Sequence, residues 1–172
     1  MFIVQFQYHG TPLIVLAAIL QTGVDFLIEG DETTYAAWYE WYPDYSYDFT
    51  NFDVSPGDSI KATVKATSKT AGTATIDNLT TGKTVTKSFS NEASLGSLCE
   101  TNAEWIVEDF ETDENLVPFA DFGSVTFTSA SYVAGGTTKS ISGATIFDVE
   151  QDDKVVTSAG ISGTSEVYVK YV

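Results

Sequence analysis

The sequence predicts an all-β protein. Residues of alternating polarity recur in short segments, the pattern of strands that bury one face. Clusters of Gly, Pro, Asn and Asp interrupt these segments every ten residues or so, as turns do. No segment has convincing 3.6-residue periodicity. Many short strands within one chain are typical of a sandwich or a barrel.

The first half of the chain supplies the clearest strands. In the aromatic segment Tyr35–Pro43, alternation places Trp38, Glu40 and Tyr42 on one face and Tyr39 and Trp41 on the other. After a turn at residues 55–58, residues 60–66 alternate between apolar side chains and Lys or Thr. We expect a hairpin from residues 73–76 and 84–89, closed around residues 78–82.

The second half continues the pattern with shorter segments. We expect strands at residues 105–110, 124–129, 144–150, 154–157 and 165–172, separated by glycine-rich or acidic turns. There is no internal repeat, linker or low-complexity tract. A length of 172 residues fits one domain that can bury a core.

The charge balance excludes several classes of partner. Asp and Glu number 24 against 8 Lys and Arg, a net charge of −16. Nucleic-acid binding requires a basic surface, and anionic membranes repel such a chain. Self-repulsion is relieved in acid, where carboxylates with pKa values near ~4 are protonated. The composition therefore suits activity at low pH, although plain solubility explains it equally well.

Few side chains are available for nucleophilic or metal-dependent catalysis. His9 is the sole histidine and would be protonated in acid. Cys99 is the sole cysteine, so no intrachain disulfide or cysteine-based metal site is possible. We interpret Cys99 as an unpaired structural residue, and we expect no cofactor.

The N-terminal segment does not resemble a leader or an anchor. It has no basic stretch, and the apolar run of residues 13–20 is too short to span a bilayer. We expect this run to be a buried strand.

Three segments carry a specific resemblance. They are residues 18–26 around Gln21, residues 99–110 around Glu104, and the aromatic segment Tyr35–Pro43 between them. In order, spacing and flanking aromatics they resemble the fungal glutamic peptidases, the eqolisin family. The resemblance covers residues 18–172. It implies an antiparallel sandwich of two curved sheets that lacks some N-terminal strands of the family, with the active site on its concave face.

The resemblance implies a catalytic pair of Gln21 and Glu104. Hydrolysis of a peptide bond requires a base for water, a donor for the oxyanion and a proton for the leaving amine. Glu104 would be the general base and then the acid, and the Gln21 amide would stabilise the oxyanion without titrating. The implied protein is an acid-active, secreted, fungal endopeptidase, a monomer that acts on proteins or peptides without a cofactor.

The same resemblance suggests which residues bind substrate. Trp38 and Tyr42 would line the cleft, and Glu40 shares their face. Asp25 lies four residues after Gln21 and therefore on its face; Ile106 lies on that of Glu104, as do Glu108 and Phe110. Core packing explains about half of these aromatic residues equally well.

The chain departs from the family pattern at several positions. Where relatives often carry Tyr-Asp-Ala-Trp, this chain has Ala36, so a cleft carboxylate is lost. The expected disulfide partner of Cys99 falls on Val15. Because the resemblance begins near Ala18, we expect residues 1–17 to be an atypical segment, from an alternative start or a mis-spliced exon, and residues 18–172 to form the peptidase domain.

Two other functions remain open. The chain could be an inactive, truncated relative, because lost strands would expose a sheet edge. It could instead be a carbohydrate-binding sandwich that presents Trp38, Trp41 and Tyr42 to sugar rings. Residues 78–80 form a glycosylation sequon, a weak signal because such triplets are common.

Overall fold

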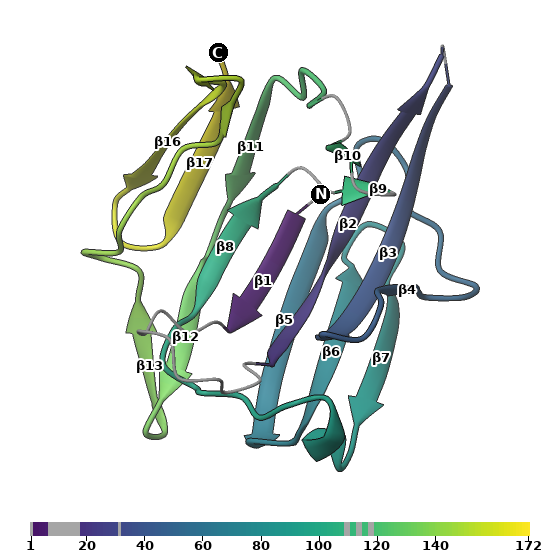
Figure 1. The fold of residues 1–172 in the computed structure, drawn as a ribbon, viewed down its shortest axis with the longest axis vertical. Coiled ribbons are helices and arrows are strands. Elements are labelled where there is room, and N and C mark those ends of the chain that lie inside the picture. Colours follow the sequence, from purple (N-terminus) through teal and green to yellow (C-terminus); the bar gives the residue numbers. More distant parts are fainter. Residues whose placement is uncertain (1, 7–17, 31, 109–110, 113–114, 117–118) are drawn as a thin grey trace. The chain divides into compact units, whose positions relative to one another are not determined.

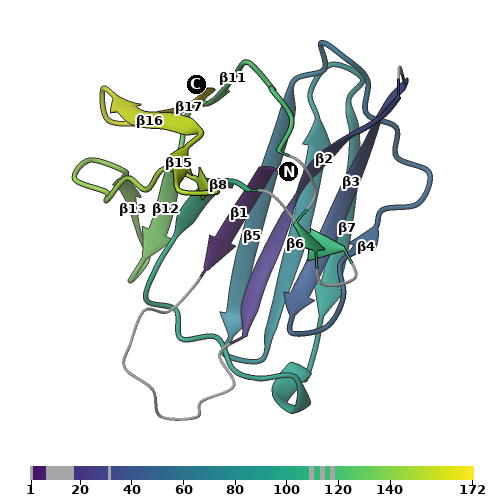
Figure 2. The same ribbon diagram turned by 45° about the horizontal axis from the view of Figure 1, so that its top comes forward.

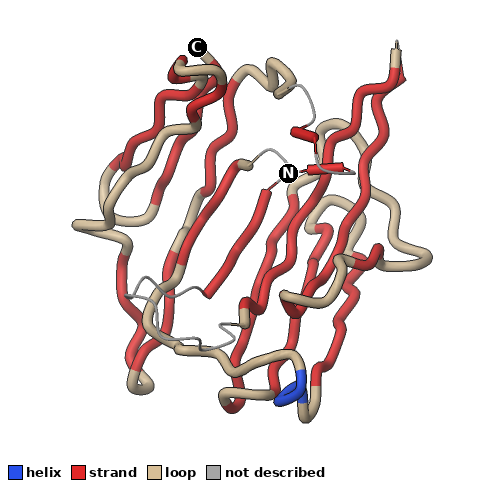
Figure 3. Tube along the Cα trace, in the orientation of Figure 1, coloured by secondary structure: helices blue, strands red, loops and turns tan. Residues whose placement is uncertain are grey.

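The computed structural model describes residues 2–6, 18–30, 32–108, 111–112, 115–116 and 119–172. Strands dominate these residues, and the helical structure described within them is the short 3₁₀ turn η1, Glu92–Ser94 (Figure 3). The predicted all-β class is confirmed. Contacts divide the chain into two compact units, Met1–Ile106 and Val107–Val172.

The first unit contains two sheets (Figure 1). The strands of one follow the order β4-β3-β2-β1-β8, and those of the other the order β5-β6-β7. The bounds are β1 Phe2–Phe6, β2 Ile19–Glu29, β3 Glu32–Tyr42, β4 Tyr47–Asp48, β5 Ile60–Ser68, β6 Ala71–Asn78, β7 Lys83–Phe89 and β8 Glu104–Val107.

The two sheets of the first unit pack as layers, with the core between them (Figure 2). Leu20 and Trp41 of the larger sheet contact Val64 and Ala74 of the smaller one, together with Leu98. A second cluster joins Val24 and Ala37 to Ile76 and Phe52. Burial of each large side chain stabilises the fold by roughly 1.5–3 kcal/mol, which holds the apolar face of β2 and β3 against the smaller sheet. The opposite face of these two strands therefore remains outside this core.

The smaller sheet confirms the predicted alternation. Val64 on β5 is buried, while Lys61 and Lys65 on the other face are exposed. β6 and β7 form the predicted antiparallel hairpin, with Gly72 opposite Phe89. Gly72 permits close packing, because a Cβ there would lie 2.6 Å from Leu20 Cδ2 and 2.7 Å from the Lys65 carbonyl oxygen.

The hairpin loop decides the weak glycosylation signal at residues 78–80. Asn78 is 0% exposed. Its Nδ2 donates to Asp58 Oδ2 (2.8 Å), and its Oδ1 accepts from the backbone N–H groups of Thr80 (3.1 Å) and Thr81 (3.0 Å). The side chain closes the turn from inside, which excludes a glycan on the folded chain.

The N-terminal residues contribute one strand. β1 pairs antiparallel with β2, with Gln5 opposite Gln21 in the register. The other neighbour of β1 is β8, and the two arrows point in opposite directions in Figure 1. Residues 1 and 7–17, which include Val15 and most of the predicted strand at residues 13–20, lie outside the described part of the chain.

The second unit consists of short antiparallel pairings and a three-stranded sheet of order β11-β17-β16. Its strands are β9 Glu111–Thr112, β10 Asn115–Leu116, β11 Ser124–Phe127, β12 Ser131–Ala134, β13 Thr137–Ser140, β14 Glu150–Gln151, β15 Lys154–Val155, β16 Thr157–Ser162 and β17 Glu166–Tyr171. Phe119 and Phe122 pack on Tyr171 of this sheet.

The predicted strand at residues 144–150 is wrong except at its last residue, where β14 begins. Hydrogen bonds that involve side chains hold this segment, instead of the backbone pairing between strands. Asp148 Oδ1 accepts from the Ala159 backbone N–H (2.7 Å), and the Val149 N–H donates to Thr157 Oγ1 (2.7 Å). Apolar alternation alone did not reveal these competing hydrogen bonds.

Candidate active site

The β2–β3 pair presents two faces of different character. Its register places Gln21 opposite Glu40 and Asp25 opposite Ala36. Strand partners in register project to the same face, and neighbours along a strand to opposite faces. Because Leu20 and Val24 enter the core, the Gln21 face is the one turned away from the smaller sheet. The sheet therefore brings five predicted residues onto one face: Gln21, Asp25, Trp38, Glu40 and Tyr42.

Gln21 and Glu40 are bonded to each other through their side chains. Gln21 Nε2 donates to Glu40 Oε2. Gln21 is 6% exposed, and within the described residues its Oε1 is buried without a hydrogen-bond partner. Burial raises the pKa of the Glu40 carboxyl; the Gln21 hydrogen bond opposes this effect and the Asp44 charge adds to it.

Trp38 separates this pair from Asp25. It stands in register with Gly23, is 1% exposed, and accepts a hydrogen bond at its backbone carbonyl from Thr22 Oγ1 (2.5 Å). Burial raises the pKa of Asp25 from 3.8 to about 6, an effect that the nearby Trp38 indole partly offsets and the Asp48 charge reinforces. No hydrogen bond of normal geometry joins the Trp38 indole to Asp25.

Unpaired polar atoms gather on this face. Gln21 Oε1, Asp25 Oδ1 and Trp38 Nε1 are all buried and lack partners among the described residues. An orphaned buried polar group costs ~1–3 kcal/mol, so folded proteins rarely retain one without a use. Two acceptors and one donor therefore lie on neighbouring register pairs of one face.

Glu104 opens β8, in the same sheet as Gln21. It is half-buried, and Asn102 Nδ2 donates to its Oε1 (3.3 Å). Since β1 lies between β2 and β8, the two backbones are separated by two strand spacings, about 10 Å. Ile106 is half-buried two residues further along β8, Glu108 follows the strand, and Phe110 lies outside the described residues.

The aromatic residues separate by face as predicted, with one correction. Tyr42 is 47% exposed at the end of β3. Trp41 is buried in the core on the opposite face from Trp38, and each is 1% exposed. The proposed sugar-binding platform of Trp38, Trp41 and Tyr42 is therefore wrong.

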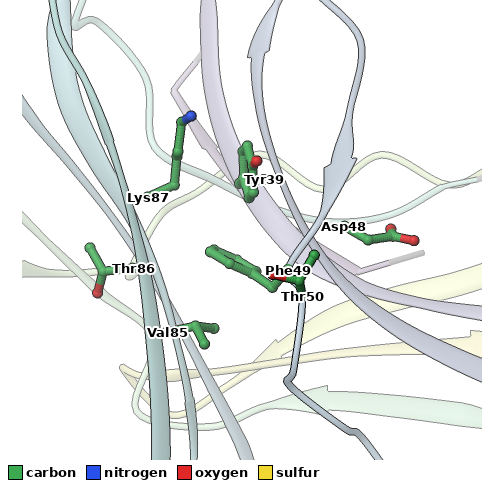
Figure 4. A pocket seen from close by; sticks show the side chains of 7 residues that line it. All are labelled: Tyr39, Asp48, Phe49, Thr50, Val85, Thr86 and Lys87. Atoms are coloured by element: carbon green, nitrogen blue, oxygen red, sulfur yellow. The ribbon is translucent and has the colours of Figure 1, made fainter.

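Two hollows among the described residues lie elsewhere. They occupy about 290 and 320 Å³ on the face of β3 that carries Tyr39, and Lys87 lines both (Figure 4). Phe49 and Thr86 line the first. None of the predicted site residues lines either hollow. The candidate site lies among the polar residues of β2, β3 and β8.

Three contacts were missed by the sequence analysis. Thr22 fixes the Trp38 backbone, Asn102 bonds Glu104, and Asp44 acts on Glu40. Period-two spacing could have revealed Asn102, since it lies two residues before Glu104. The described residues contain no cluster of three or more His, Cys, Asp or Glu arranged to hold a metal ion. Cys99 is unpaired and half-buried.

No helix in the described part of the chain is both long and apolar enough to cross a membrane.

Comparison with known proteins gives a consistent result. Residues 14–171 match the Peptidase A4 family. Aspergillopepsin-2 from Aspergillus niger is 61% identical over 155 residues, which are 90% of this chain and 54% of that protein. Scytalidopepsin B from Scytalidium lignicola is 51% identical over 155 residues, covering 86% of this chain and 58% of that protein. The chain thus spans little more than half the length of these relatives.

Solved structures agree with the sequence matches. The crystal structure of aspergilloglutamic peptidase from Aspergillus niger has a TM-score of 0.88 at 55% identity, covering 99% of this chain and 98% of that one. Scytalido-glutamic peptidase with a transition state analog inhibitor has a TM-score of 0.85 at 47% identity, covering 99% of this chain and 83% of that one. The predicted antiparallel sandwich is confirmed.

Proposed function

Because this chain belongs to the Peptidase A4 family, we propose that it is an acid-active glutamic endopeptidase that hydrolyses peptide bonds through Glu104 and Gln21. The observation that carries the proposal is the position of these two residues in one sheet, on strands two spacings apart. That interval of about 10 Å leaves room for a scissile amide between the two side chains.

Glu104 is proposed to handle the protons. Its carboxylate takes a proton from water, and the resulting hydroxide attacks the carbonyl carbon of the scissile bond. The protonated Glu104 then gives this proton to the leaving nitrogen as the C–N bond breaks. Asn102 supports the role, because its N–H group holds one carboxylate oxygen and restricts the rotation of the side chain.

Gln21 is proposed to stabilise the oxyanion. Its amide is held almost completely inside the protein and retains its hydrogen-bonding capacity at every pH. One oriented donor of this kind is typically worth ~3–4 kcal/mol of barrier. Neither role requires a histidine or a metal ion.

The remaining residues are proposed to hold the substrate. Tyr42 would contact substrate side chains, Asp25 would meet a backbone N–H, and Ile106 would line the Glu104 side. Trp38, which is 1% exposed, would support these residues from beneath rather than touch the substrate. Structures of relatives contain a peptide based transition state analog and the tripeptide Ala-Ile-His. These complexes support an extended peptide as the ligand here, and the fungal relatives support an extracellular protein.

The decisive test is cleavage of a denatured protein at about pH 2–4, near the range where carboxylates titrate. The parent chain is compared with Glu104→Gln and with Glu100→Gln, an exposed control four residues away. We expect cleavage by the parent and the control but not by Glu104→Gln, with no effect of a chelator. Cleavage by Glu104→Gln would refute the role of Glu104. No cleavage by a folded parent chain would favour the inactive relative.

A further inference from the structure

The hydrogen bond between Gln21 and Glu40 conflicts with the role proposed for Gln21. The amide nitrogen that should donate to an oxyanion donates instead to the Glu40 carboxylate. The carbonyl end, Gln21 Oε1, is buried and has no partner among the described residues. A carbonyl oxygen directed at a developing oxyanion repels it. In this arrangement the free end of the amide is therefore the acceptor Oε1, whereas the oxyanion requires the donor Nε2.

Protonation of Glu40 reverses this preference. A carboxylate only accepts hydrogen bonds, so it selects the Nε2 end of Gln21. A carboxylic acid also donates one, and the unpaired Gln21 Oε1 is a ready acceptor. Turning the amide by half a rotation then satisfies Oε1 and releases both N–H groups. It also removes a negative charge from beside the place where the oxyanion forms.

We propose that Glu40 is a positioning residue that sets which end of the Gln21 amide faces the substrate, and that its protonated form is the active one. This inference rests on the proposed function and explains why the site requires acid. The carboxylate form holds the amide in the unproductive orientation, and the acid form holds it in the productive one.

The groups around Glu40 favour its protonation. Asp44, just beyond β3, adds a negative charge, and burial disfavours the ionised form. Tyr42 is the next residue on this face of β3, and Asp25 lies two register pairs further along β2. β1 carries no titratable residue in its sequence, Phe2–Phe6.

Charges on the other strands do not reverse this effect. On one side of β3, Asp48 of β4 is in register with Trp38 and is also an acidic residue. On the other side, the next titratable residue across the sheet is Glu104 on β8. The lysines on β5 and β7, Lys61, Lys65, Lys83 and Lys87, belong to the other layer of the sandwich. The raised pKa of Glu40 follows from burial, Gln21 and Asp44, and none of these lysines contributes to it.

The first test is the pH profile of kcat for Glu40→Gln, with Glu32→Gln at the exposed start of β3 as the control. A glutamine at position 40 cannot ionise, and its NH₂ group can donate to Gln21 Oε1 at every pH. We expect Glu40→Gln to keep kcat within about threefold in acid and to extend activity at least one pH unit upward, about tenfold at the former limit. Glu32→Gln should keep the parent profile.

A second variant separates positioning from packing. Glu40→Ala removes both hydrogen-bonding forms, so kcat should fall roughly tenfold or more at every pH while KM changes less. A purely structural role would change stability without moving the alkaline limit. An unchanged alkaline limit in Glu40→Gln, with an active parent and an inactive Glu104→Gln, would overturn this inference and leave the proposed function intact.

A third measurement does not depend on activity or on the folding of any variant at position 40. The chain contains four glutamines, so ¹⁵N-glutamine labelling gives a simple NMR spectrum of side-chain NH₂ groups, in which Gln21→Ala identifies the Gln21 signals. We expect the Gln21 NH₂ protons to shift in a single titration step above the ordinary glutamate range. Gln21 signals that stay constant from pH 3 to 7 would refute the inference.

Discussion

Asp25 and Ala36 stand directly opposite each other on β2 and β3, on the face that also carries Gln21 and Glu40. Ala36 is the position where the family pattern led us to expect a carboxylate. Directly opposed residues have Cβ atoms about 4.5–5.5 Å apart, so two carboxyl groups here would share one environment. In this chain Asp25 has no such neighbour across the strand, and burial is the first cause of its raised pKa.

Restoring a carboxyl group opposite Asp25 should make the fold more sensitive to pH. In Ala36→Asp the two groups cannot both ionise cheaply, and one pKa rises further. We expect a loss of about 1–2 kcal/mol of unfolding free energy at pH 7 and a smaller loss at pH 3.5. Urea denaturation at both pH values measures it. Thr34→Asp, which faces Leu27 across the strands, is the control; equal losses at both pH values would contradict the prediction.

Asp25 itself should make the protein more stable in acid. Its pKa is about 6 in the folded chain against an ordinary 3.8, so the folded state binds the proton more tightly. The contribution of Asp25 to the free energy of unfolding is fully present below pH 3.8 and is lost as the pH rises through about 6. This contribution to the unfolding free energy is on the order of 2–3 kcal/mol.

The variant Asp25→Asn tests this contribution directly. The difference in unfolding free energy between pH 3.5 and pH 7 should shrink relative to the parent, because asparagine does not titrate. Asp121→Asn, at an exposed site in the second unit, should leave the difference unchanged. If the parent and Asp25→Asn respond identically to pH, Asp25 does not carry the effect.

Loss of the Gln21 amide should act on catalysis more than on binding. In Gln21→Ala we expect kcat to fall about 10²–10³-fold with a small change in KM, because an oxyanion donor acts in the transition state. Steady-state kinetics with a peptide substrate at acid pH give both constants. Gln151→Ala is the control. A change confined to KM would place Gln21 in binding only.

Gly72 should be intolerant of even one methyl group. In Gly72→Ala the new Cβ would lie 2.6 Å from Leu20 Cδ2 and 2.7 Å from the Lys65 carbonyl oxygen. Leu20 can shift, but the backbone oxygen belongs to a paired strand. We expect a loss of roughly 1–3 kcal/mol in chemical denaturation. Thr73→Ala, the adjacent residue on the other face, should cost less; a neutral Gly72→Ala would show that the two sheets can separate.

Alternation within the sequence predicted the β-strands and the two faces of β3 well, because both depend on local period-two patterning. It could not predict which residue of β2 meets Glu40. That depends on the hairpin register, which places Glu29 opposite Glu32 and therefore Gln21 opposite Glu40. The strand at residues 144–150 was wrongly predicted for a related reason, since Asp148 is fixed by a hydrogen bond from a backbone N–H group that a sequence pattern does not show. The inward position of Asn78 depends on hydrogen bonds of the same kind.

The strand β1 separates β2 from β8 within the larger sheet. Because Phe2–Phe6 lies between the strands of Gln21 and Glu104, these five residues set the distance between the two members of the proposed catalytic pair. If that strand withdrew, β2 and β8 could pair directly and the interval would fall from about 10 Å to about 5 Å, too narrow for a peptide bond. Under the proposed mechanism, catalysis would then depend on the pairing of residues 2–6 with β2 and β8 as well as on Gln21 and Glu104 themselves.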